Sequence, residues 1–420
     1  MLTFLCWYIL ITLIGWMAFP MAFRLFKSLP DRGYSLSRAF GWLLSGYAFW
    51  LLGSLGVLQN NSGGVVIALI LLLLASAWTL RAGRVVELRD WVREHGRYLL
   101  AAEAVFLVAF GLWTFIRSAN PELIGTEKPM ELAFINSILR SPSFPPQDPW
   151  LSGYAISYYY FGYVLVSMLI RLSAASTGVG FNLAVALLFG LTAVGAYGLV
   201  YNLLAHLGRE KCDHARATSL GLPVLGPLFI LIFSNIEGFL EMLHARGLFW
   251  SNANGQPVSG FWQWLGIQEL TQAPTPPYTW MPDRVGGIIW WRASRVLGDY
   301  DLTGNFREII DEFPFFSYLL SDMHPHVLAM PFGVLMIGVA LQVYLSSQNR
   351  SFNLWGWKVY LAPAEFAFLA ILLGGMAFLN TWDILAYTAL ISGAYVLARS
   401  RDAGWDWSRL GDFLRLAILL

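Results

Sequence analysis

Several stretches of this chain run for about 18 residues or more with almost no charged side chain. An α-helix needs that length to cross roughly 30 Å of hydrocarbon, and lipid cannot satisfy a backbone left without partners. The composition agrees, because 57% of the residues are hydrophobic and 13% are charged, against about 45–50% and about 25% in soluble domains. The sequence therefore predicts an all-α, polytopic transmembrane helical bundle with about ten to eleven spans. The apolar runs lie at 2–23, 39–57, 64–80, 98–116, 155–172, 181–204, 219–241, 325–345, 360–379, 382–398 and from about 410.

Basic residues between these runs indicate how the chain crosses the membrane, because cytoplasmic loops carry an excess of Lys and Arg. The basic clusters are Arg24, Lys27, Arg32 and Arg38; Arg81, Arg84, Arg89, Arg93 and Arg97; and Arg399 with Arg401. They place the N-terminus and the polar loop 117–153 outside the cytoplasm. Counting back from Arg399 puts 244–316 on that same side, whereas counting forward through three crossings puts it inside. We expect one stretch within 155–204 to be re-entrant, interfacial or split.

Two regions are expected: N-terminal spans at 1–97, and a transmembrane core at 98–420 with external loops at 117–153 and 244–324. Each long loop is expected to contain short interfacial helices, and the apolar end near residue 420 suggests that the chain continues. A net charge of +1 without a basic stripe argues against nucleic-acid binding. Two cysteines, Cys6 and Cys212, provide neither a disulfide framework nor a zinc ribbon. The first apolar run lacks a basic leader and is expected to be a retained span.

The first external loop contains an acidic motif, Glu127-Lys128-Pro129-Met130-Glu131, followed by a short amphipathic run that ends at Arg140. A carboxylate just outside the bilayer can act as a general base or bind a divalent ion. A solvated interfacial helix with ordinary charges is the alternative interpretation.

Three consecutive tyrosines, Tyr158, Tyr159 and Tyr160, stand at the head of the next apolar run. Tyrosine is common at membrane interfaces, where its ring is apolar and its hydroxyl stays wet. Successive helical residues point about 100° apart, so at least one of the three is expected to face the bundle interior.

A third motif, Asp322-Met323-His324-Pro325-His326, begins a later span. Pro325 has no amide donor and fits the first turn of a helix, which leaves Asp322 and His324 on extended chain. Alternate side chains of an extended run face the same way, so Asp322, His324 and His326 could converge on a metal ion or a phosphate. A polar turn before an apolar span is the simpler alternative.

Charged residues inside the apolar runs also indicate function, since an ionisable group in hydrocarbon usually faces an interior cavity. Glu103, Glu237 and Asp383 are such residues. They could line the path of a transporter, although we find no internal repeat. Glu237 lies near the outer end of its run and is a candidate second carboxylate.

The ordered set of motifs resembles the Chlor_Arch_YYY membrane proteins, a family with a YYYxG motif. The resemblance starts near Glu103, and the segments that carry it are 127–134, 144–153, 158–162, 291–295, 308–316 and 322–326. That family in turn looks like the GT-C glycosyltransferases, which take a sugar from a polyprenyl-phosphate carrier outside the cytoplasm. The resemblance implies a GT-C-like fold with Glu131 at the position of the catalytic acid. The family more often has Asp there, so the longer Glu changes the geometry.

The resemblance leads us to expect a glycosyltransferase of the cell membrane that uses a polyprenyl-phosphate-linked sugar and an unidentified acceptor at its extracytoplasmic face. Glu131 would be the base, with Asp322 and Glu237 orienting the acceptor or holding Mg²⁺ or Mn²⁺. Asp322 and His324 are the metal-ligand candidates. A small-molecule or lipid transporter and a structural scaffold are the competing hypotheses. The residues expected to bind substrate are Lys128, Arg140, Tyr158, Tyr159, Tyr160, Arg292, Arg295, His324 and His326.

Overall fold

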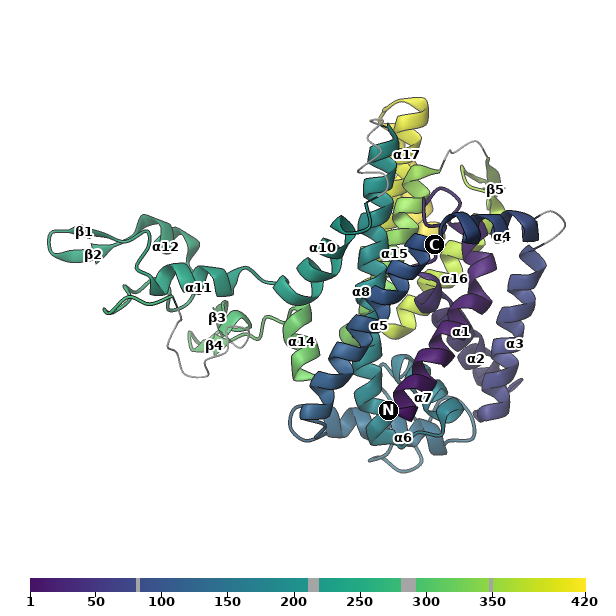
Figure 1. The fold of residues 1–420 in the computed structure, drawn as a ribbon, viewed down its shortest axis with the longest axis horizontal. Helices are drawn as coiled ribbons and strands as arrows, with labels where there is room; N and C mark the ends of the chain where they lie inside the picture. Colours follow the sequence, from purple (N-terminus) through teal and green to yellow (C-terminus); the bar gives the residue numbers. More distant parts are fainter. Residues whose placement is uncertain (81–83, 211–218, 281–291, 347–349) are drawn as a thin grey trace. The chain divides into compact units, whose positions relative to one another are not determined.

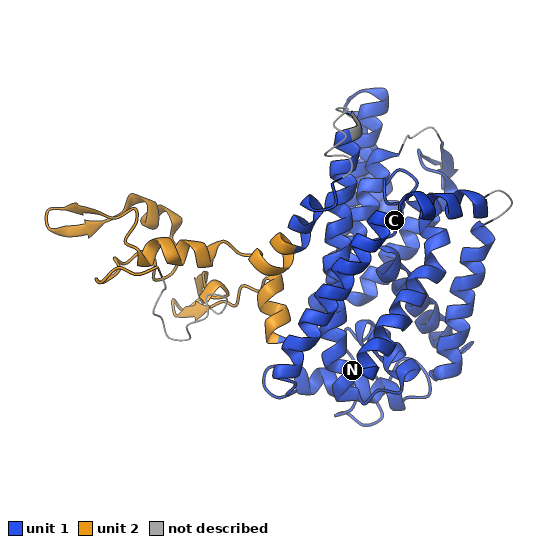
Figure 2. Ribbon diagram, viewed as in Figure 1, with its two compact units in different colours: residues 1–227, 321–420 blue, residues 228–320 orange. Residues whose placement is uncertain are grey.

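The computed structural model describes residues 1–80, 84–210, 219–280, 292–346 and 350–420. These residues form two compact units, one made of 1–227 with 321–420 and one made of 228–320 (Figure 2). The described chain is mostly helical with short two-stranded sheets, which confirms the predicted helical class. The boundary expected near residue 97 stays a prediction.

The first unit is a bundle of long helices (Figure 1). A single hairpin, β5 (Phe352–Leu354) with β6 (Trp357–Val359), joins two of its helices within the described ranges. The helices are α1 (Leu2–Leu25), α2 (Ser37–Ser54), α3 (Ser62–Thr79), α4 (Arg84–Glu94), α5 (Gly96–Ala119), α6 (Lys128–Arg140), α7 (Phe161–Ser173), α8 (Thr177–Glu210), the short turns η1 (Leu222–Val224) and α10 (Leu225–Pro227), α15 (Pro325–Leu345), α16 (Pro363–Leu379), α17 (Asp383–Ala403) and α18 (Ser408–Leu419).

Among the described residues, five helices are long and apolar enough to cross a membrane: α1, α3, α5, α8 and α15. A bent pair, 222–233 with 237–245, brings the number to six if it forms one span. The expected ten to eleven spans are therefore not confirmed. Helix α7 has 13 residues, which gives it a length of about 20 Å, so it is too short to cross the bilayer alone. The re-entrant, interfacial or split stretch expected within 155–204 stays a prediction.

Helix α8 is the most deeply buried of these five helices, with 94% of its most apolar window buried. It packs along α5, where the rings of Trp113 and Phe189 stack with their centroids 4.0 Å apart. Gly198 permits a close approach between α8 and the segment that contains Ser35, because a Cβ atom at Gly198 would lie 1.8 Å from the hydroxyl of Ser35. Small and flat side chains thus let the neighbouring backbones come together.

Two charges inside the bundle neutralise each other. Arg38 of α2 is 2% exposed, and its guanidinium lies 2.5 Å from the carboxylate of Glu103 on α5. The hydroxyl groups of Tyr8 and Tyr34 also donate hydrogen bonds to this carboxylate. The cost of placing either ion in an apolar bundle is offset by this pairing.

Among its described residues, the second unit contains only short helices and short strands. They are η2 (Leu228–Phe233, a π-helix), α11 (Glu237–Ala245), α12 (Gly260–Leu265), α14 (Pro314–Leu320) and two antiparallel hairpins, β1 (Ser251–Ala253) with β2 (Gln256–Val258) and β3 (Gly298–Tyr300) with β4 (Phe306–Glu308). The unit covers most of the expected loop 244–324.

Candidate active site

The candidate site is built on α6, the short helix of the first polar loop. Its buried side chains include Glu131, Phe134, Ile135 and Ile138, which share one helical face through their spacing of three and four residues. Glu131 therefore enters the apolar interior together with its hydrophobic neighbours. The carboxylate is 0% exposed.

A second segment, far along the chain, covers this acid. Helix α15 begins at Pro325 with His324 as its N-cap residue, as expected from the sequence. Ser321, just before it, has a φ of 66°, in the left-handed region that non-glycine residues rarely adopt. This turn directs residues 322–324 across α6.

Met323 makes the contact between the two segments. Its backbone amide donates to Glu131 Oε2 at 2.8 Å, and its carbonyl accepts a hydrogen bond from the Tyr163 hydroxyl at 3.0 Å. Glu131 Oε1 is buried and has no hydrogen-bond partner among the described residues. One oxygen of the acid is thus held in place, and the other keeps its capacity to accept or carry a proton.

Burial sets the protonation state of this acid. Removal from water disfavours the carboxylate and raises the pKa of Glu131 from its ordinary 4.5 to about 8. The amide of Met323 acts in the opposite direction, while the negative charge of Asp322 adds to the rise. Glu131 consequently titrates near neutral pH, where a general acid or base is most effective.

Charged groups gather beside Glu131 on the same two segments. Asp322, 3% exposed, accepts a hydrogen bond from Thr126 at 2.5 Å and lies 3.6 Å from the ammonium of Lys128. The imidazole Nε2 of His324 lies 3.2 Å from Glu127 and 3.8 Å from Asp322. The site therefore combines carboxylates, an ammonium group and an imidazole around one buried acid.

The three tyrosines point in different directions. Tyr158 stacks on Phe134 at 5.7 Å, next to Glu131, and Tyr159 packs edge-on against Tyr158 at 5.4 Å. Tyr160 instead accepts a hydrogen bond from the indole of Trp50 at 3.0 Å. Burial raises the pKa of Tyr158, and the charges of Glu127 and Glu131 add to this effect. Tyr158 is thus the tyrosine of the motif nearest to the acid.

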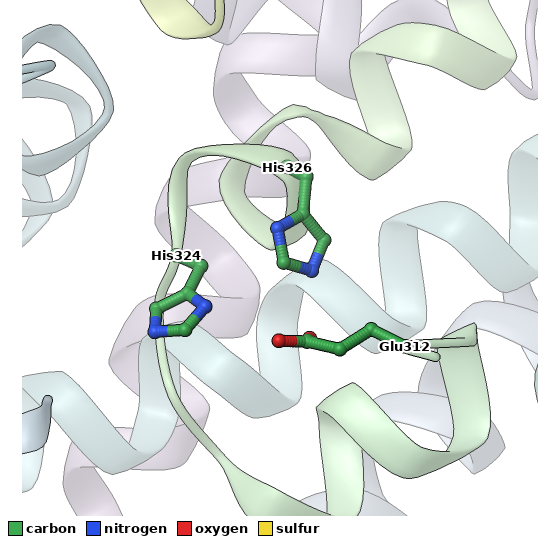
Figure 3. A group of neighbouring side chains, drawn as sticks. All are labelled: Glu312, His324 and His326. Atoms are coloured by element: carbon green, nitrogen blue, oxygen red, sulfur yellow. The ribbon is translucent and has the colours of Figure 1, made fainter. Parts of the chain in front are cut away.

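His326 follows on the first turn of α15, and its ring centroid is 5.6 Å from that of His324 (Figure 3). Two imidazoles at this spacing are chemically suited to hold one divalent transition-metal ion. A metal role for Asp322 and His324 stays a prediction.

One predicted residue of the first unit, Arg140, lies apart from this group, and three others belong to the second unit. Arg140 is exposed at the far end of α6, about 13 Å along the helix from Glu131. Glu237, Arg292 and Arg295 belong to the second unit.

Within the second unit, these arginines contact carboxylates. Arg292 lies 2.7 Å from Glu269 and 3.4 Å from Glu241, and Arg295 lies 2.9 Å from Glu308. Glu237 is buried at the start of α11. Trp291, also part of that motif, falls outside the described residues.

Sequence reasoning missed two participants, Thr126 and Tyr163. Thr126 has a φ of 51° and follows Gly125, with a φ of 75°, so this turn brings its hydroxyl to Asp322. The Gly125-Thr126 pair was the available signal for a turn. Tyr163 lies one residue beyond the YYYxG motif, and no local pattern indicates its bond to Met323.

The chain matches a known protein family over most of its length. Residues 44–418 match the family described as an uncharacterized membrane protein family, DUF2298. No curated protein and no solved structure matches the chain.

Proposed function

This chain belongs to the uncharacterized membrane protein family DUF2298, and we propose that it is a membrane glycosyltransferase in which Glu131 is the general base. The donor would be a sugar linked to polyprenyl phosphate, and the acceptor a hydroxyl or amine at the extracytoplasmic face. The observation that carries the proposal is the buried carboxylate of Glu131, which has one anchored oxygen and one oxygen without a described partner.

In the proposed reaction the acceptor oxygen or nitrogen attacks the anomeric carbon of the donor sugar. A new glycosidic bond forms, and the bond from that carbon to the phosphate oxygen breaks. Its electron pair leaves with polyprenyl phosphate, and the acceptor proton passes to Glu131 Oε1. A base with a pKa of about 8 can take this proton and release it to water afterwards.

The departing phosphate needs positive charge or hydrogen-bond donors close to the base. Lys128 and His324 are the groups of the first unit that could meet this need, because both contact Asp322 beside Glu131. Arg292 and Arg295, which contact carboxylates within the second unit, stay predicted substrate-binding residues. A divalent ion on Asp322 and His324 would supply further positive charge.

The resemblance to GT-C enzymes supports the same proposal from the order of features along the chain. An acidic residue, an amphipathic helix, a proline-rich stretch and an aromatic-headed apolar run follow one another at 131, 132–140, 144–150 and 158–172. A single site built from the loops 117–153 and 244–324 requires that Glu131 contact the 322–324 segment. The hydrogen bond from the Met323 amide to Glu131 is such a contact.

The test is complementation of a strain that lacks the gene, with mass spectrometry of extracted lipids. Polyprenyl-phosphate-linked sugars should accumulate in the deletion strain and in one carrying Glu131→Gln, and return to normal with wild type. Glu122→Gln, an exposed acid of the same loop, is the matched control. Glu131→Asp should restore part of the activity, since it keeps the carboxylate. Full complementation by folded Glu131→Gln would remove the proposed base.

A further inference from the structure

A groove in the first unit extends to the end of the bundle at which α1 finishes and α4 begins. It has a volume of about 640 Å³ and runs between α1, α2, α3 and α16, lined mostly by apolar side chains such as Leu25, Leu44, Leu72 and Phe368. Cavities of about 300–1,000 Å³ commonly hold small molecules. The size and the apolar lining fit a flexible hydrocarbon chain.

One end of this groove is basic. Arg24, Thr79 and Arg84 line the groove and also an adjoining cavity of about 200 Å³, which Lys27 and Arg32 help to enclose. Arg32 lies 3.6 Å from Glu87, and Lys27 lies 3.5 Å from Glu365. Arg84 donates a hydrogen bond to the carbonyl of Thr79 at 3.0 Å, and among the described residues neither Arg24 nor Arg84 forms an ion pair with a carboxylate.

The outer wall of the groove faces the surroundings of the bundle. Only 28% of the apolar window of α3 is buried, and Leu71 and Trp78, which line the groove, are 39% and 67% exposed. Tryptophan at the end of an apolar helix is typical of the membrane interface. A lipid could therefore enter from the bilayer with its tail in the groove and its headgroup at the basic end.

We propose that the groove binds an anionic glycerophospholipid, with the phosphate between Arg24 and Arg84 and an acyl chain along α3. Charge decides the ligand class, because two arginines without described carboxylate partners favour a headgroup with net negative charge. Basic residues at this end also mark the side expected to face the cytoplasm, where anionic lipids attract them.

This site is separate from the candidate active site. Trp7 of α1 donates a hydrogen bond to Ser173 of α7, at the end of the unit that carries α6 (Figure 1). Arg24 follows 17 residues later, about 26 Å along the same helix. Arg24 and Arg84 thus lie almost a bilayer thickness from the Trp7 end of α1, Glu131 does not line the groove, and lipid binding is proposed to be independent of the reaction.

Native mass spectrometry of the full chain in detergent tests the proposal. Delipidated protein is offered phosphatidylglycerol or phosphatidylcholine with identical acyl chains. We expect phosphatidylglycerol to bind roughly tenfold more tightly, and Arg24→Gln with Arg84→Gln to abolish this preference. Arg89→Gln is the control, since Arg89 is an exposed arginine of α4 that does not line either cavity.

A second pair of variants tests the apolar part of the site. Ala75→Phe should fill the groove and displace the lipid, whereas Leu74→Phe, on the neighbouring position that does not line it, should leave binding unchanged. Equal binding of the two lipids by wild type would overturn the proposal. A charge preference that survives in the double arginine variant would overturn it as well.

Discussion

The backbone amide of Met323 donates a 2.8 Å hydrogen bond to the fully buried carboxylate of Glu131, across 192 positions of sequence. This bond joins the short helix of the first polar loop to the segment that begins α15. It defines the candidate site more directly than any single motif does, because it brings together the two acidic segments that the sequence singled out.

The buried acid should make the stability of the protein depend on pH. The pKa of Glu131 is about 8 in the folded chain and 4.5 as its ordinary value. Between these values the folded state holds a proton that the unfolded state has released, so stability falls as pH rises. We expect the melting temperature of the detergent-solubilised protein to drop from pH 5 to pH 9, measured by intrinsic fluorescence.

Glu131→Gln separates this effect from other titrations. The amide cannot ionise, so the variant should match wild type near pH 5 and exceed it near pH 9. Equal pH slopes for the two proteins would show that Glu131 does not carry the dependence.

The same pKa predicts the pH profile of the proposed reaction. A base must be ionised to accept a proton, so activity should rise about tenfold per pH unit below 8 and level off above it. The assay adds the purified protein to membranes of the deletion strain and follows the consumption of the lipid-linked sugar that has accumulated there. Glu122→Gln should keep the rising limb, and a flat profile between pH 6 and pH 8 would argue against Glu131 as the base.

The pair Lys128 and Asp322 should be coupled in stability. Both side chains are largely buried and lie 3.6 Å apart, so removing one leaves a charge without its partner. We expect Lys128→Met and Asp322→Asn each to lower the melting temperature, and the double variant to lose less than their sum. A double-mutant cycle should give a coupling of about 0.5–3 kcal/mol. Strict additivity would mean that the pair does not interact.

Helix packing in the first unit supplies a prediction that is independent of function. A methyl group at Gly198 of α8 would lie 1.8 Å from the hydroxyl of Ser35, and nothing lies within 4 Å of the corresponding position at Gly393 of α17. Gly198→Ala should destabilise the bundle by about 1–3 kcal/mol. Gly393→Ala should be neutral or slightly stabilising, because alanine favours the helix. Thermal unfolding followed by circular dichroism compares the two variants.

Hydrophobic runs predicted most of the helices well. The runs at 2–23, 64–80, 98–116 and 325–345 correspond to α1, α3, α5 and α15, since their length and apolarity are properties of the local sequence. The run at 219–241 was harder to interpret. The chain there breaks into short turns, a π-helix and α11, and 222–233 meets 237–245 at an angle of 68°. Ser234 and Asn235 at this break are residues that commonly begin a new helix, and Asn235 accepts a hydrogen bond from the amide of Glu237.

The site was predictable only in part. Pro325 indicated where α15 begins, and the spacing of Glu131 with Phe134 and Ile138 indicated a shared helical face. The bond from Met323 could not be read from sequence, because a backbone amide carries no residue identity. The charge of Glu103 inside an apolar run also depends on a distant partner, because Glu103 pairs with Arg38, which lies on another helix.

The burial of Glu131 also affects how quickly it can exchange its proton. The acid has no exposed surface, and two hydrogen bonds hold the backbone of Met323, one from its amide to Glu131 and one from the Tyr163 hydroxyl to its carbonyl. We therefore expect water to reach the carboxylate when these hydrogen bonds open, and local opening of this kind takes microseconds to seconds. Proton exchange at Glu131 should then follow the rate of this backbone opening, which amide hydrogen exchange at Met323 can measure.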